Sequence, residues 1–239
     1  MSLAMAHKRR VLGMVAAGVA AASVAAVTPY TADDALSSPA NAKKHLALQE
    51  AALDVDLARL SEIKSLAGKT ELKRNELLGK YQPYIQRYCE SGLVFPNRVL
   101  VQVMVWLFDT AQFDDGLELA EIAIAQGQLM PERFKRDIQT FVADAVCEWA
   151  YDEYSAERSP EPYLSDLLVR VDGDWRLPEQ IPAKYHKLIG IRALEAEEFE
   201  TALHHLERAR ELYPKVGVDV RIDKCRKALA KQEAAAGGQ

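Results

Sequence analysis

Two paired-helix segments, residues 100–131 and 183–214, constrain the fold of this chain more than any other feature of its sequence. In each segment, apolar residues recur at helical spacing on both sides of a short polar corner. The corner of the first segment is acidic and covers residues 109–115. Paired helices of this kind build scaffolds that hold partners, and they do not supply the pocket that catalysis needs. These segments therefore predict a helical binding protein.

The second segment resembles one tetratricopeptide unit. Gly190 and Ala202 stand where its two helices would cross closely, and Phe199 would fill the corner between them. Ala209 would pack inside, and Pro214 would stop the second helix. The first segment has residues of similar kinds at matching offsets: Phe113, Gly116 and Ala123. Two separated copies are too few for a true solenoid.

A long helical hairpin is predicted over residues 42–92. Ser38 followed by Pro39 is a helix-start pattern, because Pro is tolerated in the first helical turn. The first helix carries a leucine stripe of seven-residue spacing, formed by Leu46, Leu53 and Leu60 and widened by Leu57. Such a stripe suits packing on the chain's own core and contact between subunits equally well, so both alternatives stay open. Under the second alternative, these leucines hold a homo-oligomer together.

Glycine and proline indicate where the helices end or bend. Gly68 would separate the two hairpin helices, and Pro83 would kink the second, which is expected over residues 70–90. Pro131 is expected to end the second helix of the first pair. Residues 178–182, with a proline at each end, are expected to form an extended connector.

The predicted fold class is all-α, a long helical hairpin followed by paired helices with tetratricopeptide-like packing. Four parts are expected: a basic, Ala-rich arm with a linker (1–41), the hairpin (42–92), a helical-pair domain (93–215), and a basic helix with a frayed tail (216–239).

Composition narrows the class of partner. The net charge is −5, from 30 basic and 35 acidic side chains, whereas a protein that coats DNA broadly is normally basic. Any contact with nucleic acid must therefore use a local basic patch, repeated by oligomerisation. The 3 cysteines are far apart and form no CxxC pair, which indicates reduced thiols and no zinc site.

The N-terminus has two interpretations. Lys8, Arg9 and Arg10 precede an uncharged run over residues 11–27, which is the layout of a signal peptide. The run is rich in Ala and contains two glycines, and it is marginal for a membrane span. The alternative is a small-residue helix or arm with a basic head.

No catalytic or metal centre is predicted. Gly68-Lys69-Thr70 looks like the end of a phosphate-binding loop, but Ile63 stands where its first glycine belongs and a helix precedes it. The acidic pair Asp114-Asp115 lies at a corner, where Asp is favoured for local hydrogen bonding. His204 and His205 are neighbours on a helix, so their side chains are expected to diverge.

With these motifs in order, the chain resembles the phage terminase small subunit family, most closely the gene M product type of temperate contractile-tailed phages. The resemblance covers about residues 4–225 and is carried by the order and spacing of several stretches. These are SLAMAHKRRVLG, the long helix through Leu60, VMVWLFDTAQFDDGLELAEIAIAQGQLMP, and IPAKYHKLIGIRALEAEEFETALHHLERARELYP.

The resemblance implies a role in packaging viral DNA. A small terminase subunit binds the cohesive-end or packaging site of double-stranded phage DNA and recruits a large subunit, which supplies the ATPase and nuclease. The resemblance implies a homo-oligomeric ring in the cytoplasm of the bacterial host, no membrane partner, and no place in the virion structure. It implies no cofactor in this chain, with ATP and Mg²⁺ expected in the large subunit.

Two alternatives remain beside this interpretation. Proteins of this family are often named as terminase endonuclease subunits, so the chain could carry its own DNA-cutting activity. The N-terminus and the tetratricopeptide-like pair would also fit an exported helical-repeat adaptor.

DNA contacts are expected near the N-terminus. The predicted DNA-binding residues are Lys8, Arg9 and Arg10 at the head, with Lys43 and Lys44 at the start of the long helix. They flank a linker that could reach around a duplex. Family members can carry a long Lys/Arg-rich tail beyond the stretch that ends here in AAAGGQ, so the expectation rests on the N-terminal part.

Overall fold

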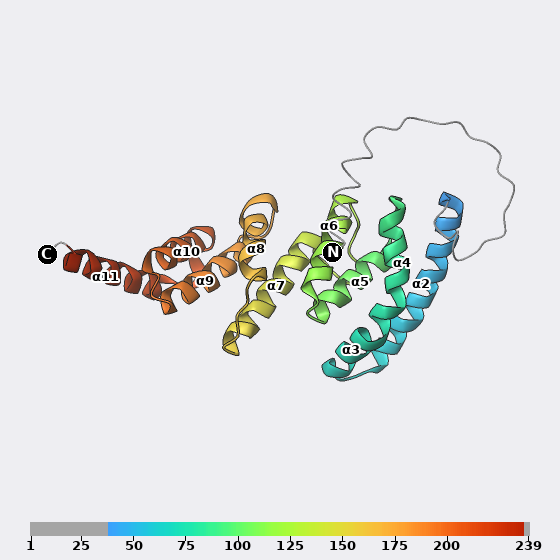
Figure 1. Cartoon of the computed structure of the whole chain (residues 1–239), viewed down its shortest axis with the longest axis horizontal. Helices are drawn as coiled ribbons and strands as arrows, with labels where there is room; N and C mark the ends of the chain where they lie inside the picture. The colour runs from blue at the N-terminus through green and yellow to red at the C-terminus, as the bar shows by residue number, and fades with distance from the viewer. Residues whose placement is uncertain (1–37, 237–239) are drawn as a thin grey trace, which may run out of the picture. The chain divides into compact units, whose positions relative to one another are not determined.

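The computed structural model describes residues 38–236, and every regular element in that range is a helix. This confirms the predicted all-α class. The elements are α2 (Pro39–Glu62), α3 (Leu66–Leu72), a π-helical turn (Lys73–Leu77), α4 (Leu78–Ser91), α5 (Arg98–Asp109), α6 (Phe113–Ala125), α7 (Ile138–Ser155), α8 (Tyr163–Val169), a second π-helical turn (Arg170–Asp174), α9 (Gln180–Glu195), α10 (Phe199–Leu212), a 3₁₀ turn (Pro214–Val216) and α11 (Asp219–Ala236) (Figure 1). None of these described helices combines the length and the hydropathy needed to cross a membrane.

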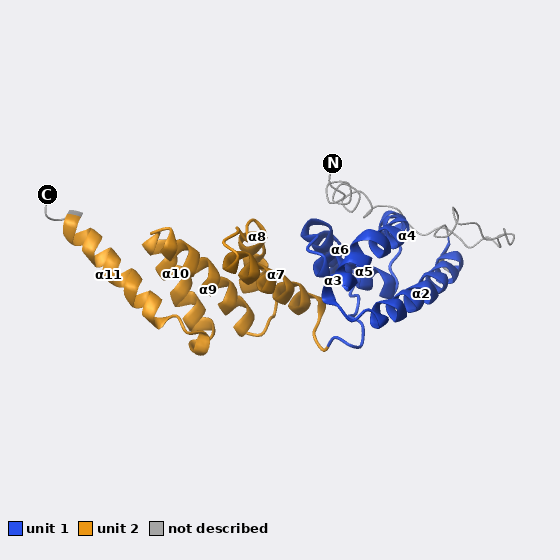
Figure 2. Cartoon of the chain, turned by 90° about the horizontal axis from the view of Figure 1, so that it is seen from below, with its two compact units in different colours: residues 1–134 blue, residues 135–239 orange. Residues whose placement is uncertain are grey.

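The chain divides into two compact units, Met1–Phe134 and Lys135–Gln239 (Figure 2). The division falls inside the predicted helical-pair domain, so the first pair, α5 and α6, belongs to one unit and the second pair, α9 and α10, to the other. The four-part organisation expected from the sequence stays a prediction.

Helix α5 forms the centre of the first unit. Every residue from Val99 to Phe108 is buried, and the helix packs against α2, α4 and α6. The Trp106 ring lies 5.8 Å from the ring of Tyr81 on α4, centroid to centroid. Burial of this many large side chains is the main favourable term in folding a unit of this size.

The leucine stripe of α2 lies on the inner side of this unit. Leu53 and Leu60 are 0% and 6% exposed, while Leu46 and Leu57 are half-buried. These packing contacts lie within a single chain. The structure therefore supports the own-core alternative for Leu53 and Leu60, and their role in oligomerisation stays a prediction.

The break between the hairpin helices differs from the prediction. It lies at residues 63–65, and Gly68 is inside the first turn of α3, where its N–H donates to the Ser65 hydroxyl at 3.1 Å. The prediction rested on the conformational freedom of Gly68 and missed the capping power of Ser65, three residues earlier. Beyond α3 the helix continues through the π-helical turn into α4.

Two proline predictions were also wrong. Helix α6 ends at Ala125 rather than at Pro131, because Gly127 adopts φ +63° and donates its N–H to the Ile124 carbonyl. Pro182 lies in the first turn of α9 instead of in an extended connector. A backbone N–H in the first turn has no hydrogen-bond partner within the helix, so the missing N–H of Pro182 costs nothing and the helix can begin around it.

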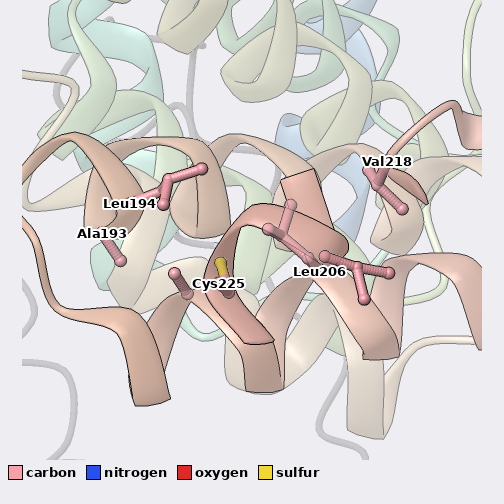
Figure 3. Close-up of a cluster of buried hydrophobic side chains, with 7 residues drawn as sticks. Ala193, Leu194, Leu206, Val218 and Cys225 are labelled. Carbon is pink, nitrogen blue, oxygen red and sulfur yellow. The ribbon is translucent and has the colours of Figure 1, made fainter. Parts of the chain in front are cut away.

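The crossing predicted for α9 and α10 is confirmed in the second unit. A Cβ added to Gly190 would lie 2.8 Å from Leu206 Cγ and 3.2 Å from the Ala202 carbonyl oxygen. Ala202 and Ala209 are both 0% exposed. Helix α11 closes the far side of α10 through the apolar cluster drawn in Figure 3, to which it contributes Cys225.

Candidate nucleic-acid interface

The predicted contact residues are placed only in part. Lys8, Arg9 and Arg10 lie outside the described residues. Lys43 and Lys44 lie near the start of α2, where both side chains are exposed, between buried Ala42 and buried His45. The capped first turn, in which the Ser38 hydroxyl accepts from the Asn41 N–H at 3.2 Å, holds them on the surface of the first unit.

Most basic side chains in the stretch from α3 through α4 form ion pairs or hydrogen bonds within the first unit. Lys73 Nζ lies 2.6 Å from the Asp109 carboxylate, and Arg74 donates to the Thr110 carbonyl at 2.6 Å. Lys80 Nζ lies 2.6 Å from Asp56. A side chain held by its own partner must give up that partner before it contacts a phosphate, so these residues make a poor DNA surface.

Asp56 is the most strongly held of these partners. It is 1% exposed and accepts hydrogen bonds from Lys80, from the Tyr81 hydroxyl at 2.7 Å and from Arg59 at 3.2 Å. Burial would raise the pKa of Asp56, but the hydrogen bonds from Lys80 and Tyr81 outweigh burial and leave the pKa below its usual range. The basic residues here therefore stabilise the hairpin.

Helix α11 carries a different kind of basic surface. Its inner face contributes Ile222 and Cys225, with Val218 just before the helix, to the core of the second unit. Four exposed cations follow one another along α11 at spacings of three, three and four residues: Lys224, Lys227 and Lys231 lie on the opposite face, and Arg221 lies at its edge, on the side of Tyr151 and Lys187. None of these four forms an ion pair with a described residue, and only Asp223 stands at the edge of their row.

Two other charged residues of α11 are paired across to α10. Arg226 contacts Glu207, and Asp219 lies 3.5 Å from Arg210. These pairs sit toward the α10 side, which leaves the outer row of cations facing solvent. A row of cations on one helix face fits the phosphates of a nucleic-acid backbone.

A polar cluster in the second unit was missed from the sequence. His186 Nδ1 lies 2.9 Å from His205 Nδ1, and His186 Nε2 lies 3.1 Å from Asp172, which Arg208 also contacts through two hydrogen bonds of 2.9 Å. The expectation that His204 and His205 diverge was wrong: their rings lie in a T-shaped contact with centroids 5.2 Å apart, and His205 is the more buried of the two. Among residues 38–236, no group of three or more His, Cys, Asp or Glu side chains could hold a metal ion.

Comparison with known proteins agrees with the resemblance. A family model described as "Phage small terminase subunit" matches residues 50–180. A protein of Haemophilus phage HP1 named "Probable terminase, endonuclease subunit" is 34% identical over 192 residues, which cover 75% of this chain and 68% of that protein. A protein of Escherichia phage P2 named "Terminase, endonuclease subunit" is 27% identical over 157 residues, which cover 66% of this chain and 64% of that protein. No solved structure gives a significant match.

Proposed function

Because this chain belongs to the phage small terminase subunit family, we propose that it binds the packaging site of phage DNA and delivers that DNA to the large subunit. The family acts in phage DNA packaging. The matches span about two thirds of the two relatives, so the binding site, the partner and the assembly are all part of the proposal. The setting is the host cytoplasm, and ATP and Mg²⁺ belong to the large subunit.

The row of cations on α11 is the observation that carries the DNA-binding part. The whole chain has a net charge of −5, and DNA would repel it at long range unless a cationic face is turned toward the duplex. Arg221, Lys224, Lys227 and Lys231 supply such a face on one rigid helix. Lys8, Arg9 and Arg10, together with Lys43 and Lys44, are proposed as additional contacts.

Oligomerisation would multiply this face. A ring places one α11 row per copy around or beside the duplex, so a modest patch becomes a belt of positive charge. This arrangement is proposed from family membership, and it reconciles an acidic chain with a DNA ligand.

A DNA-cutting activity of this chain is the second candidate, because both relatives carry the word endonuclease in their names. The acidic pair Asp114-Asp115 lies exposed in the first turn of α6. We expect the isolated chain neither to hydrolyse ATP nor to cut DNA with Mg²⁺. Cleavage that persists through repeated purification and vanishes in an Asp114→Asn, Asp115→Asn variant would favour this candidate.

The binding test compares two variants, each of which loses four positive charges. One replaces Arg221, Lys224, Lys227 and Lys231 with Ala. Its control replaces four exposed basic residues that lie off α11: Lys64, Lys135, Arg176 and Lys215. Duplex affinity is measured by fluorescence anisotropy over a series of salt concentrations.

The α11 variant should bind every sequence more weakly, and its salt slope should flatten by up to about 0.9 for each phosphate that it no longer neutralises. The control should keep most of its affinity and of its salt slope. Equal reductions in the two variants would show that only net charge matters, and the α11 face would then not be the contact.

A further inference from the structure

Helix α2 carries a second apolar stripe, on the side opposite its buried leucines. Leu48 and Val55 are 59% and 62% exposed, and Ala51 and Ala58 are exposed in line with them. Spacings of three, four and three residues place these side chains in one row along the helix. Both views show α2 at an edge of the first unit, with α4 along one side (Figures 1 and 2).

We propose that this outer stripe is a two-fold interface, on which α2 of a second copy of this chain packs antiparallel. In a register centred on residue 53, Leu48 faces Ala58 of the second copy and Val55 faces Ala51 of the second copy. Each large side chain then meets a small one, which lets two helices approach closely and interdigitate. Two-fold symmetry repeats both contacts at once.

The charges at the two ends of the stripe select the antiparallel direction. Lys44 lies one turn before Leu48, and Glu62 lies one turn after Ala58. Antiparallel packing brings Lys44 beside Glu62 of the second copy at both ends, so Lys44 is available for a DNA phosphate only while α2 is unpaired. Parallel packing would set Lys44 against Lys44 and Glu62 against Glu62, and like charges at this spacing repel. Neither residue forms an ion pair with a described residue of its own chain.

The flanks of the stripe are already neutralised. Arg59 on one flank lies 2.6 Å from Glu76, and Asp54 on the other flank lies 2.7 Å from Arg98. In the proposed register the two copies of Asp54 approach each other near the two-fold axis. The Arg98 guanidinium beside each carboxylate balances that charge.

The size of the stripe sets the strength of the contact. Each copy would bury only two large apolar side chains. The buried area is therefore smaller than the roughly 800 Å² per partner that a stable dimer interface buries. We therefore expect a weak dimer that forms as concentration rises, or one that works together with other contacts in a larger assembly. The inner leucines cannot supply this contact, because Leu53 and Leu60 are already buried.

The first test is sedimentation velocity over a wide range of concentration. Wild type should shift from monomer toward dimer, and Val55→Lys should weaken the dimer at least about tenfold. Val220→Lys is the matched control, since Val220 is an 83% exposed valine on α11, and it should leave the dimer unchanged. Both positions are exposed, so circular dichroism should show both variants folded.

A charge swap tests the direction. Lys44→Glu alone and Glu62→Lys alone should each weaken self-association, and the double variant should restore it. Both substitutions also suit the helix macrodipole, so neither should disturb α2 itself. Failure of the double variant to recover would contradict the antiparallel register.

Cross-linking gives an independent reading. Lys44→Cys protein mixed with Glu62→Cys protein should form a covalent dimer with a short bis-maleimide, and neither protein alone should exceed the wild-type background. Self-linking of either single variant would show parallel packing and overturn the proposal. A wild type that stays monomeric, with Leu48 and Val55 protected from hydroxyl-radical labelling, would show that another part of the chain covers the stripe, which also overturns it.

Discussion

His186 and His205 meet Nδ1 to Nδ1 at 2.9 Å across the α9–α10 crossing. Two facing ring nitrogens can share only one proton, so one ring donates and the other accepts. With Asp172 at 3.1 Å from His186 Nε2, His186 donates to the carboxylate and accepts from His205. Arg208 holds the same carboxylate in a two-point contact. The hydrogen bonds of this cluster therefore form with both histidines neutral.

Acid should destabilise the second unit through this pair. Burial, and then the nearby His186 and His204, lower the pKa of His205 to about 4. Burial also lowers the pKa of His186, although the Asp172 carboxylate acts in the opposite direction. Because the unfolded chain titrates near 6.5, it binds protons first as the pH falls, and stability is lost between pH of about 6.5 and 4. We expect a loss of about 2 kcal/mol over this window. Urea unfolding at several pH values measures it, and a His205→Gln variant should have a flatter profile. An unchanged profile in that variant would exclude His205 as the cause.

Gly190 should resist even the smallest substitution. A Cβ there meets Leu206 Cγ at 2.8 Å, so Gly190→Ala should cost about 1–3 kcal/mol through overpacking, more than the gain in helix propensity returns. Gly79→Ala is the control, because nothing lies within 4 Å of its Cβ position in α4. The control should stabilise by about 0.5–1 kcal/mol. Thermal melts compare the two, and a stable Gly190→Ala protein would mean that the helices are not in close contact.

Asp56 should matter far more than its neighbour Asp54. Asp56→Ala leaves the buried Tyr81 hydroxyl without its acceptor and Lys80 without its ion pair, at a cost of about 2–3 kcal/mol. Asp54→Ala breaks only an exposed pair with Arg98, worth about 0–1 kcal/mol. Denaturant unfolding of the two variants should separate them, and similar midpoints would contradict the role given to Asp56.

The basic head should contribute to DNA affinity independently of sequence. Replacing Lys8, Arg9 and Arg10 with Ala should weaken binding to all duplexes, and each phosphate left without its cation should flatten the salt slope by up to about 0.9. Deleting residues 1–30 should have the same effect without changing the oligomeric state. Unchanged affinity and slope after the deletion would leave α11 as the contact surface.

Local spacing explains which parts of the fold were predictable. The close approach at Gly190 and Ala202 was expected, because small residues at a helix crossing leave a pattern in the sequence. The start of α3 and the end of α6 were not, because Ser65 and Gly127 competed with more conspicuous glycine and proline signals nearby. Boundaries of this kind depend on single capping residues.

Interactions between distant residues account for most of what was missed at the candidate site. Asp172 and His186 are 14 residues apart, and His186 and His205 are 19 apart, and no local pattern joins a turn to two helices. The basic row on α11 was within reach of the sequence, since its spacing is helical. The packed structure was needed to show that Lys73 and Lys80 are held by acidic partners. It was also needed to show that Arg221, Lys224, Lys227 and Lys231 form no ion pair with a described residue, whereas Arg226 does.

Competition binding with the purified chain tests the central claim most directly. A labelled duplex carrying the phage packaging site is bound, and unlabelled specific or random duplex of equal length is then added at a fixed, stated salt concentration. We predict that the specific duplex competes at least about tenfold more effectively than the random one, and that the labelled DNA remains uncut in Mg²⁺. Equal competition by both duplexes, or no binding by the intact chain, would contradict a role in recognising packaging DNA.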